Sequence, residues 1–438
     1  IKDMAGLVKP YAATKLVKAL REEVGLPIHF HTHDTSGINA ASILKACDAG
    51  VDAADAAVSS MSGTTSQPNL NSVVAALDNT PRATGLDADA LQRYADYWEV
   101  VRAWYAPFDS APKSGTAEVY LHEMPGGQYT NLKEQAEAMG LGERWPEVAR
   151  AYADVNMAFG DIVKVTPSSK VVGDMALFLV SHGLTMRDIE ALGPNHSLHI
   201  PNSVADMFMG SLGEPQGGWP KKLQQTILKG QKPRKGRPGA HLPAVDLKEA
   251  AEAASKKAGH KLSHSDLMSY LMYPDVYVKF ARNQQAWSAV EVLPTAQFFY
   301  GMQRGEEITV EIEPGKTLIV KSLTISEPHP DGTRTVFFEL NGQPREVTVR
   351  DKSLEVKTAE RLKADPGHPG HVGAPIPGAV SSVAVELSQT VAKGDRLLVM
   401  EAMKMQTTVN APVSGRITQL LVAPGQTVEP KDLLLVIE

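Results

Sequence analysis

Three histidines alternate along one short segment and could bind a transition metal. Residues 27–33 read PIHFHTH, so single residues separate His29, His31 and His33. In a β-strand the three imidazoles would point to one face, because side chains alternate along a strand. Two neutral imidazoles that project together form half of a metal site, although polar packing in a core is an alternative role. Asp34 follows directly, where its carboxylate could support a ligand or cap the next helix.

A lysine near the C-terminus indicates a second kind of chemistry. Lys404 lies between Met403 and Met405, at the junction of an internal repeat in which residues 373–401 align with residues 410–438 without a gap. Each copy consists of short β-branched segments separated by Gly, Pro and Asp turns, so we expect the two copies to pack as one flattened barrel. A tight turn between the copies would expose the lysine to an enzyme that acylates its amine, whereas an ordinary solvated lysine is the alternative.

The sequence around this lysine resembles the biotin carrier domain of biotin-dependent carboxylases. The resemblance depends on the AMKM motif at residues 402–405 and on the flanking repeat. Lipoyl domains share the fold, but they typically have Asp and Ala or Val beside their lysine rather than methionines. The resemblance implies that Lys404 carries biotin, which a biotin protein ligase attaches.

The histidine segment belongs to a region that alternates helices and strands. Apolar periodicity predicts helices over residues 10–24, 37–49 and 69–79, and strands over residues 27–33 and 51–57. This alternation indicates a parallel sheet, with a TIM-type (β/α) barrel as the expected closure. Only three or four β/α units are present in the sequence, which begins at Ile1. We therefore expect a truncated chain, with half of the barrel encoded upstream.

The pattern divides the chain into several domains of α/β and β type. We expect a partial barrel over residues 1–84, a helical extension over 85–293, a small antiparallel β domain over 294–363, a Pro/Gly/His linker over 364–373 that lets the carrier swing, and a biotinyl/lipoyl-type flattened barrel over 374–438. Strands in the small β domain are expected at residues 307–313, 316–325, 333–340 and 345–349. The basic run at 229–238 is interpreted as a solvated loop rather than a site for an anionic ligand.

Composition restricts the class of protein. The 438 residues are 43% hydrophobic and 21% charged, which is typical of soluble globular domains. A formal charge of −6 disfavours a general nucleic-acid binder. The single cysteine, Cys47, excludes an internal disulfide framework. No run of about 18 apolar residues predicts a membrane span.

Five motifs along the chain resemble the pyruvate carboxylase family. IKDMAG at residues 1–6, HTHDTSG at 31–37 and SSMSGTTSQP at 59–68 resemble its carboxyltransferase domain. The motifs MPGGQ at 124–128 and VTPSSK at 165–170 continue this resemblance in the same order. Residues 294–325 resemble the allosteric and tetramerisation segment that follows in that family, so the likeness covers essentially the whole chain.

The resemblance implies roles for particular residues. Lys2 would be carbamylated and would hold a divalent metal, Mn²⁺ or Zn²⁺, together with His31 and His33; without the resemblance, a plain barrel-end lysine is the simpler interpretation. Thr166 would move a proton between the pyruvate methyl group and biotin, a task that suits a hydroxyl because it both donates and accepts, and it could also begin a helix. Ser169 and Lys170 would contact the carboxybiotin head. The remaining metal-ligand aspartate and the pyruvate-binding arginine of the family are not in this sequence and are expected upstream.

The implied reaction transfers a carboxyl group from carboxybiotin to pyruvate and yields oxaloacetate. The resemblance also implies a homotetramer regulated by acetyl-CoA, in the bacterial cytoplasm or, for a eukaryotic protein, the mitochondrial matrix. ATP and Mg²⁺ would act only at a biotin carboxylase domain, and this sequence has no Gly-rich loop of the P-loop or dinucleotide type. A decarboxylase or transcarboxylase subunit, and a non-enzymatic carrier and assembly fragment, are the alternatives.

Overall fold

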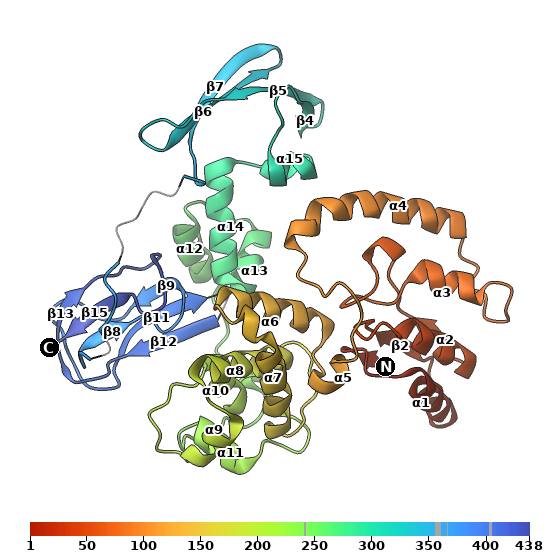
Figure 1. Ribbon diagram of the computed structural model, residues 1–438, viewed down its shortest axis with the longest axis horizontal. Helices are drawn as coiled ribbons and strands as arrows, with labels where there is room; N and C mark the ends of the chain where they lie inside the picture. The colour runs from red at the N-terminus through yellow and green to blue at the C-terminus, as the bar shows by residue number, and fades with distance from the viewer. Residues whose placement is uncertain (241, 355–360, 366, 403–404) are drawn as a thin grey trace. The chain divides into compact units, whose positions relative to one another are not determined.

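The computed structural model covers residues 1–438 and describes all of them except 241, 355–360, 366 and 403–404 (Figure 1). For residues 402 and 405 it describes the backbone alone. The chain forms two compact units, one of residues 1–240 with 361–438 and the other of residues 241–360.

The N-terminal part of the first unit is a parallel three-stranded sheet in the order β1-β2-β3. Its strands are β1 (Lys2–Asp3), β2 (His29–Thr32) and β3 (Ala53–Ala54), connected through α1 (Pro10–Glu23) and α2 (Asn39–Ala49) and followed by α3 (Leu70–Leu77). The buried side chains of β2, chiefly Phe30, pack with Val17 of α1, Ile43 of α2 and Val73 of α3. The helices therefore cover the sheet face that carries Phe30, and the histidines of β2 lie on the other face.

This arrangement confirms the predicted β/α alternation with a parallel sheet. The third strand is shorter than expected, because only residues 53–54 of the predicted 51–57 pair with β2. After Asp55 the chain leaves the ladder and reaches the 3₁₀ turn η1 (Ser59–Met61).

The middle of the first unit is helical, as predicted. It contains the elements α4 (Ala88–Tyr105), η2 (Ala106–Phe108), α5 (Val119–His122), α6 (Gly126–Ala138), η3 (Gly142–Arg144), α7 (Trp145–Ala158), α8 (Ser168–His182), α9 (Met186–Leu192), α10 (Asn202–Phe208), α11 (Lys221–Ile227) and η4 (Pro238–Ala240). Every residue of α8 from Val171 to Val180 is buried. Because a helix that is buried all round must lie inside a core, the neighbouring helices pack around α8.

The C-terminal part of the first unit is a sandwich of two four-stranded sheets with an internal symmetry. The sheet orders are β10-β13-β15-β8 and β14-β9-β11-β12. The strands are β8 (His371–Gly373), β9 (Gly378–Val383), β10 (Thr390–Val391), β11 (Arg396–Ala402), β12 (Met405–Asn410), β13 (Gly415–Leu420), β14 (Thr427–Val428) and β15 (Leu433–Ile437). A shift by the repeat offset carries β9 onto β13, β10 onto β14 and the start of β11 onto that of β15, so one sheet maps onto the other. The predicted two-fold flattened barrel is thereby confirmed.

Residues that precede this sandwich are hydrogen bonded to it. The Leu433 N–H donates to the Leu362 carbonyl oxygen over 2.7 Å, and the Ala364 N–H donates to the Lys431 carbonyl oxygen over 2.8 Å. The Lys363 ammonium lies 2.7 Å from the buried Asp432 carboxylate. The hydrogen-bonded sandwich therefore extends into the segment expected to be a linker, residues 364–373.

The second unit combines a helical part with an antiparallel sheet. Its helices are α12 (Leu247–Ala258), α13 (His264–Met272), α14 (Pro274–Trp287), η5 (Val290–Val292) and α15 (Thr295–Tyr300). Its sheet has the order β4-β5-β6-β7, with β4 (Glu307–Glu313), β5 (Lys316–Ile325), β6 (Thr333–Leu340) and β7 (Gln343–Arg350). Three of these four strands begin and end at the predicted residues. Val310 of β4 is buried while Thr309 and Glu311 are exposed, but Ile312 is exposed too, so the predicted apolar face of this strand is only partly buried.

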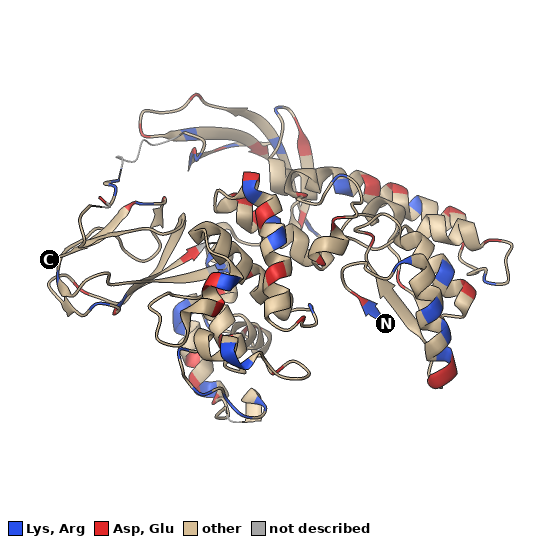
Figure 2. Cartoon of the chain, turned by 60° about the horizontal axis from the view of Figure 1, so that its bottom comes forward, with Lys and Arg blue, Asp and Glu red and all other residues tan. Residues whose placement is uncertain are grey.

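Acidic and basic side chains both occur on most of the helices (Figure 2). Among the described residues, no helix is both long and apolar enough to cross a membrane.

Candidate functional site

The two histidines at the end of β2 converge through their Nε2 atoms, which lie 3.2 Å apart. The His31 Nδ1 atom is 2.7 Å from a carboxylate oxygen of Asp55, and the His33 Nδ1 atom is 2.7 Å from the carbonyl oxygen of Thr65. Both of these partners accept hydrogen bonds, so each Nδ1 atom carries the hydrogen and each Nε2 atom presents a lone pair. Two facing lone pairs repel each other unless a cation binds between them.

The pair fits a metal ion. Two nitrogen ligands about 2.0–2.1 Å from one ion and 3.2 Å from each other subtend an angle of about 100° at the ion, close to that of tetrahedral or octahedral coordination. Histidine ligands commonly donate their other ring N–H to a carboxylate or a carbonyl oxygen, as both do here. The chemistry of the donor set therefore suits a divalent transition metal.

Asp55 orients one of these ligands, a role that the sequence interpretation missed. Its two carboxylate oxygens contact His29 and His31, each over 2.7 Å. Burial opposes ionisation of Asp55, but the hydrogen bonds from the two imidazoles outweigh it and the pKa of the carboxyl is lowered. β3 pairs in parallel with β2, and His29 lies opposite Ala53. Asp55 follows Ala53 by two residues, just as His31 follows His29, and this matching spacing was the sequence signal for the contact. His29 lies on the same face but contacts Asp55 and is largely exposed.

The neutral form of His33 is favoured by its surroundings. Burial lowers the pKa of His33; the hydrogen bond to Thr65 opposes this effect, and the nearby His31 and Lys2 add to it. A neutral imidazole is the form that binds a metal.

Lys2 lies beside the histidine pair. β1 and β2 are parallel and place Lys2 opposite His31, so both side chains emerge on the same sheet face. Within the described part of the chain, no group of three or more His, Cys, Asp or Glu side chains is arranged to hold a metal. The register therefore puts the Lys2 side chain on the sheet face that carries the histidine pair.

The two aspartates that flank the strands have structural roles. Asp3 accepts hydrogen bonds from the Leu7 and Val8 N–H groups over 2.8 and 2.9 Å and thereby holds the turn before α1. Asp34 accepts from the N–H of Asn39 over 2.9 Å, at the beginning of α2. Of the two roles considered for Asp34, the structure thus supports the cap.

Gly126 brings the MPGGQ motif into contact with this site. A Cβ atom at Gly126 would lie 2.3 Å from the Thr65 carbonyl oxygen and 2.6 Å from the His33 Nδ1 atom. The Gly126 N–H also donates to the carbonyl oxygen of Met4 over 3.0 Å. Only a residue without a side chain allows α6 to begin this close to His33.

The same helix contacts α8 two residues further along. A Cβ atom at Gly173 of α8 would lie 2.6 Å from the Gln128 Nε2 atom and 2.9 Å from the Leu132 Cδ1 atom. The first turns of α6 therefore lie between the histidine pair and α8.

The loop that contains Thr166 is attached to the MPGGQ segment by an ion pair. Thr166 is exposed immediately before α8, and the Lys164 ammonium in this loop lies 2.9 Å from the Glu123 carboxylate. The Ser168 hydroxyl stabilises the loop by donating to the carbonyl oxygen of Val163 over 2.7 Å. The ion pair thus joins the residue before the VTPSSK motif to the residue before the MPGGQ motif.

The two residues expected to contact carboxybiotin differ in exposure. Ser169 is buried at the beginning of α8. The Lys170 side chain is 40% exposed, and its ammonium lies 2.5 Å from the buried Asp174 carboxylate. Lys404 lies outside the described residues; the strands on either side of it, β11 and β12, pair in antiparallel fashion as far as Ala402 and Met405.

Comparison with known proteins assigns the three parts of the first unit to families. Residues 1–97 match the HMGL-like family, residues 119–321 match the conserved carboxylase domain, and residues 370–437 match the domain of biotin-requiring enzymes. The second of these matches also includes part of the second unit.

Curated relatives align with almost the whole chain. A pyruvate carboxylase of Bacillus subtilis is 50% identical over 409 residues, which are 93% of this chain and 36% of the relative. The mitochondrial pyruvate carboxylase of Homo sapiens is 43% identical over 412 residues, or 93% of this chain and 35% of the relative. The chain thus spans just over a third of the length of these relatives.

Solved structures show the same likeness. The complete multifunctional pyruvate carboxylase from Rhizobium etli is 51% identical, with a TM-score of 0.74 over 99% of this chain and 40% of that one. The carboxyl transferase domain of the same protein, solved with pyruvate and biocytin, is 54% identical, with a TM-score of 0.75 over 80% of this chain and 59% of that one.

Proposed function

Because this chain belongs to the pyruvate carboxylase family, as its carboxyltransferase and biotin-carrier portion, we propose that it transfers a carboxyl group from carboxybiotin to pyruvate. The observation that carries the proposal is the pair of facing Nε2 lone pairs, joined through Gly126 and Glu123 to the loop of Thr166. An enolate-forming transfer would require an oriented metal site and a hydroxyl that exchanges protons, and the proposal takes the histidine pair and Thr166 for these roles.

His31 and His33 would hold a divalent metal, Mn²⁺ or Zn²⁺, together with a carbamate on Lys2. A free ammonium repels a dication, whereas a lysine carbamate is an anionic oxygen ligand. When bound, the ion would supply positive charge that stabilises the negative oxygen of the pyruvate enolate. Asp55 and Thr65 contribute by keeping the two Nε2 lone pairs directed at the same point.

Thr166 would move the proton. After the bond between biotin N1 and the carboxyl carbon breaks and CO2 departs, N1 accepts the hydroxyl proton, and the hydroxyl oxygen takes a proton from the pyruvate methyl group. The resulting enolate carbon then forms a bond to CO2 and gives oxaloacetate. Ser169 and Lys170 would hold the biotin head during this exchange.

The other parts of the chain would serve the same cycle. Biotin, attached to Lys404 by a biotin protein ligase, would be carboxylated at a separate site that uses ATP and Mg²⁺. The second unit would take part in a homotetramer whose activity responds to acetyl-CoA. We place such an enzyme in the bacterial cytoplasm, or in the mitochondrial matrix of a eukaryote.

Thr166→Ala in the full-length protein tests this function. Loss of the hydroxyl should reduce oxaloacetate formation from pyruvate, and biotin-dependent oxaloacetate decarboxylation, by roughly 10²–10⁴-fold, the usual contribution of acid–base catalysis. Bicarbonate-dependent ATP cleavage should persist, because it does not involve Thr166. The control, Thr166→Ser, keeps a hydroxyl and should retain much more activity. Near-normal oxaloacetate formation by Thr166→Ala would show that Thr166 serves only to begin α8.

A further inference from the structure

A buried aspartate in α8 has one carboxylate oxygen fully engaged and the other without a partner. Asp174 is 1% exposed, and its Oδ2 atom lies 2.5 Å from the Lys170 ammonium and 2.6 Å from the Ser203 hydroxyl. Its Oδ1 atom is buried and has no hydrogen-bond partner among the described residues. Because an unpartnered buried carboxylate oxygen costs folding free energy, the arrangement calls for an explanation other than stability.

The contacts fix the position of the Lys170 ammonium. Lys170 and Asp174 are four residues apart on one helix, a spacing at which exposed ion pairs contribute little. Here, however, the Asp174 carboxylate is buried in the core and accepts a hydrogen bond from Ser203 of the separate helix α10. The carboxylate therefore stays in one position when the lysine side chain moves. The flexible Lys170 side chain is therefore restricted to a place that Asp174 of the same helix and Ser203 of α10 determine.

The Lys170 ammonium retains N–H groups that can donate to a ligand. A lysine ammonium has three N–H groups, and Asp174 accepts one of them. The Lys170 side chain is 40% exposed, so the other two can reach a ligand at the beginning of α8, next to Thr166. A suitable ligand is a planar cyclic urea, whose oxygen becomes negative when a substituent leaves one of its nitrogens.

We propose that Asp174 is a positioning residue that, with Ser203, holds the Lys170 ammonium for the ureido oxygen of the biotin head. The inference rests on the proposed function, because it takes Lys170 as a contact of biotin. Asp174 itself does not touch the ligand and acts only through Lys170.

The experiment measures biotin-dependent oxaloacetate decarboxylation in the full-length protein with Lys404→Arg, so that free biotin is the only carrier. Asp174→Asn should raise the KM for biotin about tenfold, the loss expected when one hydrogen bond to a charged group is misplaced. The KM for oxaloacetate should stay within about twofold, because only the biotin contact is altered. The double variant with Lys170→Met should bind biotin no worse than Lys170→Met alone, since Asp174 acts through that lysine.

Two further variants separate positioning from folding. Asp174→Glu keeps the charge but moves the carboxylate by one methylene group, and it should also raise the KM for biotin even if Asp174→Asn does not fold. Asp188→Asn, in the exposed cap of the adjacent helix α9, is the matched control and should leave the KM for biotin unchanged. An unchanged KM for biotin in the folded Asp174 variants, or effects of the two sites that multiply in the double variant, would overturn the proposal.

The proposed function has its own readout in the same assay. If the parent protein shows no biotin-dependent decarboxylation, or if Thr166→Ala retains it, the carboxyltransferase function fails. If both behave as expected and the Asp174 variants behave like the parent, only the role of Asp174 is refuted.

Discussion

At the scale of single residues, the candidate metal site depends on hydrogen bonds that set the tautomers of its ligands. Asp55 and the Thr65 carbonyl oxygen each bind an Nδ1 atom, and this leaves the Nε2 atoms of His31 and His33 as the lone-pair donors. Removing such supporting contacts typically weakens metal binding about 10–100-fold, even though the ligands themselves are unchanged.

Gly126→Ala should weaken metal binding at this site. The added Cβ atom would meet the Thr65 carbonyl oxygen at 2.3 Å and the His33 Nδ1 atom at 2.6 Å, so His33 or its acceptor must move. We expect a loss of about 10–100-fold in metal affinity, measured by elemental analysis and by titration with Mn²⁺ or Zn²⁺.

The adjacent glycine provides a matched control for this experiment. A Cβ atom at Gly127 would meet no atom within 4 Å, so Gly127→Ala should leave metal binding intact and stabilise α6 slightly. Equal metal affinities in the two variants would show that the close approach of Gly126 does not matter for His33.

His122 should make folding stability depend on pH. It is 4% exposed, its Nδ1 atom accepts from the Met124 N–H over 3.0 Å, and burial lowers its pKa to about 4. The unfolded chain binds a proton near pH 6.5 while the folded chain does not, so stability is complete above about pH 6.5 and falls as the pH drops to about 4. The loss over this window should be about 3 kcal/mol.

The measurement is chemical denaturation at a series of pH values between 4 and 7.5. His122→Asn keeps an acceptor for Met124 but cannot titrate, so this part of the pH dependence should disappear. The same slope in the variant and the parent would contradict the assignment to His122.

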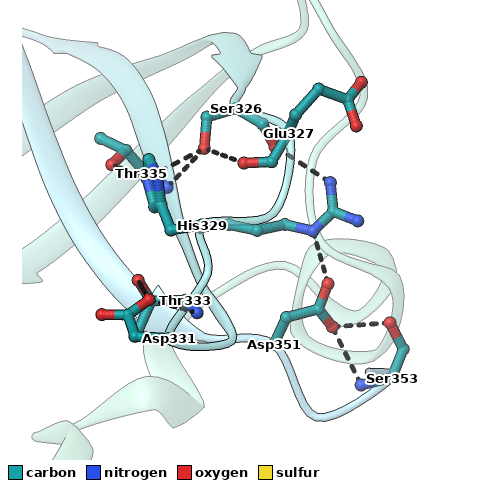
Figure 3. A network of polar contacts seen from close by, with 9 residues as sticks. Ser326, Glu327, His329, Asp331, Thr333, Thr335, Asp351 and Ser353 are labelled. Carbon is teal, nitrogen blue, oxygen red and sulfur yellow. Dashed lines mark hydrogen bonds and ion pairs between the residues drawn. The ribbon is translucent and has the colours of Figure 1, made fainter. Parts of the chain in front are cut away.

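At the scale of elements, the sheet of the second unit is held at one end by a polar network (Figure 3). The Arg334 guanidinium of β6 donates to the Asp351 carboxylate over 2.5 Å and to the Ser326 carbonyl oxygen over 3.0 Å. The Ser326 hydroxyl accepts from the Thr335 N–H over 2.9 Å, and the His329 ring contacts the Thr335 hydroxyl over 3.0 Å. These contacts join the ends of β5, β6 and β7.

Asp351 should stabilise this sheet in a pH-dependent way. Hydrogen bonds from Ser353, followed by those from Arg334, lower the pKa of Asp351 to about 2. Because the folded pKa lies below the unfolded value of about 3.9, the contribution is complete above that value and is lost as the pH falls to about 2.

Asp351→Asn should therefore lower the unfolding temperature of the sheet at pH 7 and make it less sensitive to pH between about 4 and 2. The measurement is thermal unfolding across this range, with Glu346→Gln on the exposed side of β7 as the control. If Asp351→Asn and Glu346→Gln behave alike, the network does not stabilise the strand ends.

At the scale of the whole molecule, the chain combines a chemical site with a carrier sandwich of two repeated halves. The repeat explains why the two sheets map onto each other, and position 404 falls between its two copies, residues 373–401 and 410–438. Two hydrogen bonds extend the sandwich beyond the repeat: the Leu433 N–H of β15 donates to the Leu362 carbonyl oxygen, and the Ala364 N–H donates to the Lys431 carbonyl oxygen.

Lys404 should be the single site of biotin attachment. Incubation with biotin protein ligase, biotin and ATP should add the mass of one biotin to the protein, and Lys404→Arg should abolish the addition. A lipoyl adduct, or biotin on another lysine in the peptide map, would refute the assignment that the Ala-Met-Lys-Met setting suggests.

Features that depend on local periodicity were predictable from the sequence. Strands β4, β5 and β6 begin and end at the expected residues, because alternation with a period of two is a property of neighbouring positions. The repeat at residues 373–401 and 410–438 likewise predicted two equivalent sheets. The resemblance of short motifs pointed to His31, His33 and Thr166, whose roles remain to be tested.

The contacts that orient these residues were decided only by tertiary structure. Asp55 meets His31, Gly126 meets His33, Lys164 meets Glu123, and Ser203 meets Asp174, in each case across 24 to 93 positions of sequence or between separate elements. A sequence pattern records which side chains share a face of one strand or helix, but not which faces meet. That depends on how the helices pack around α8 and on the register of the parallel strands, which arise only when the whole core forms.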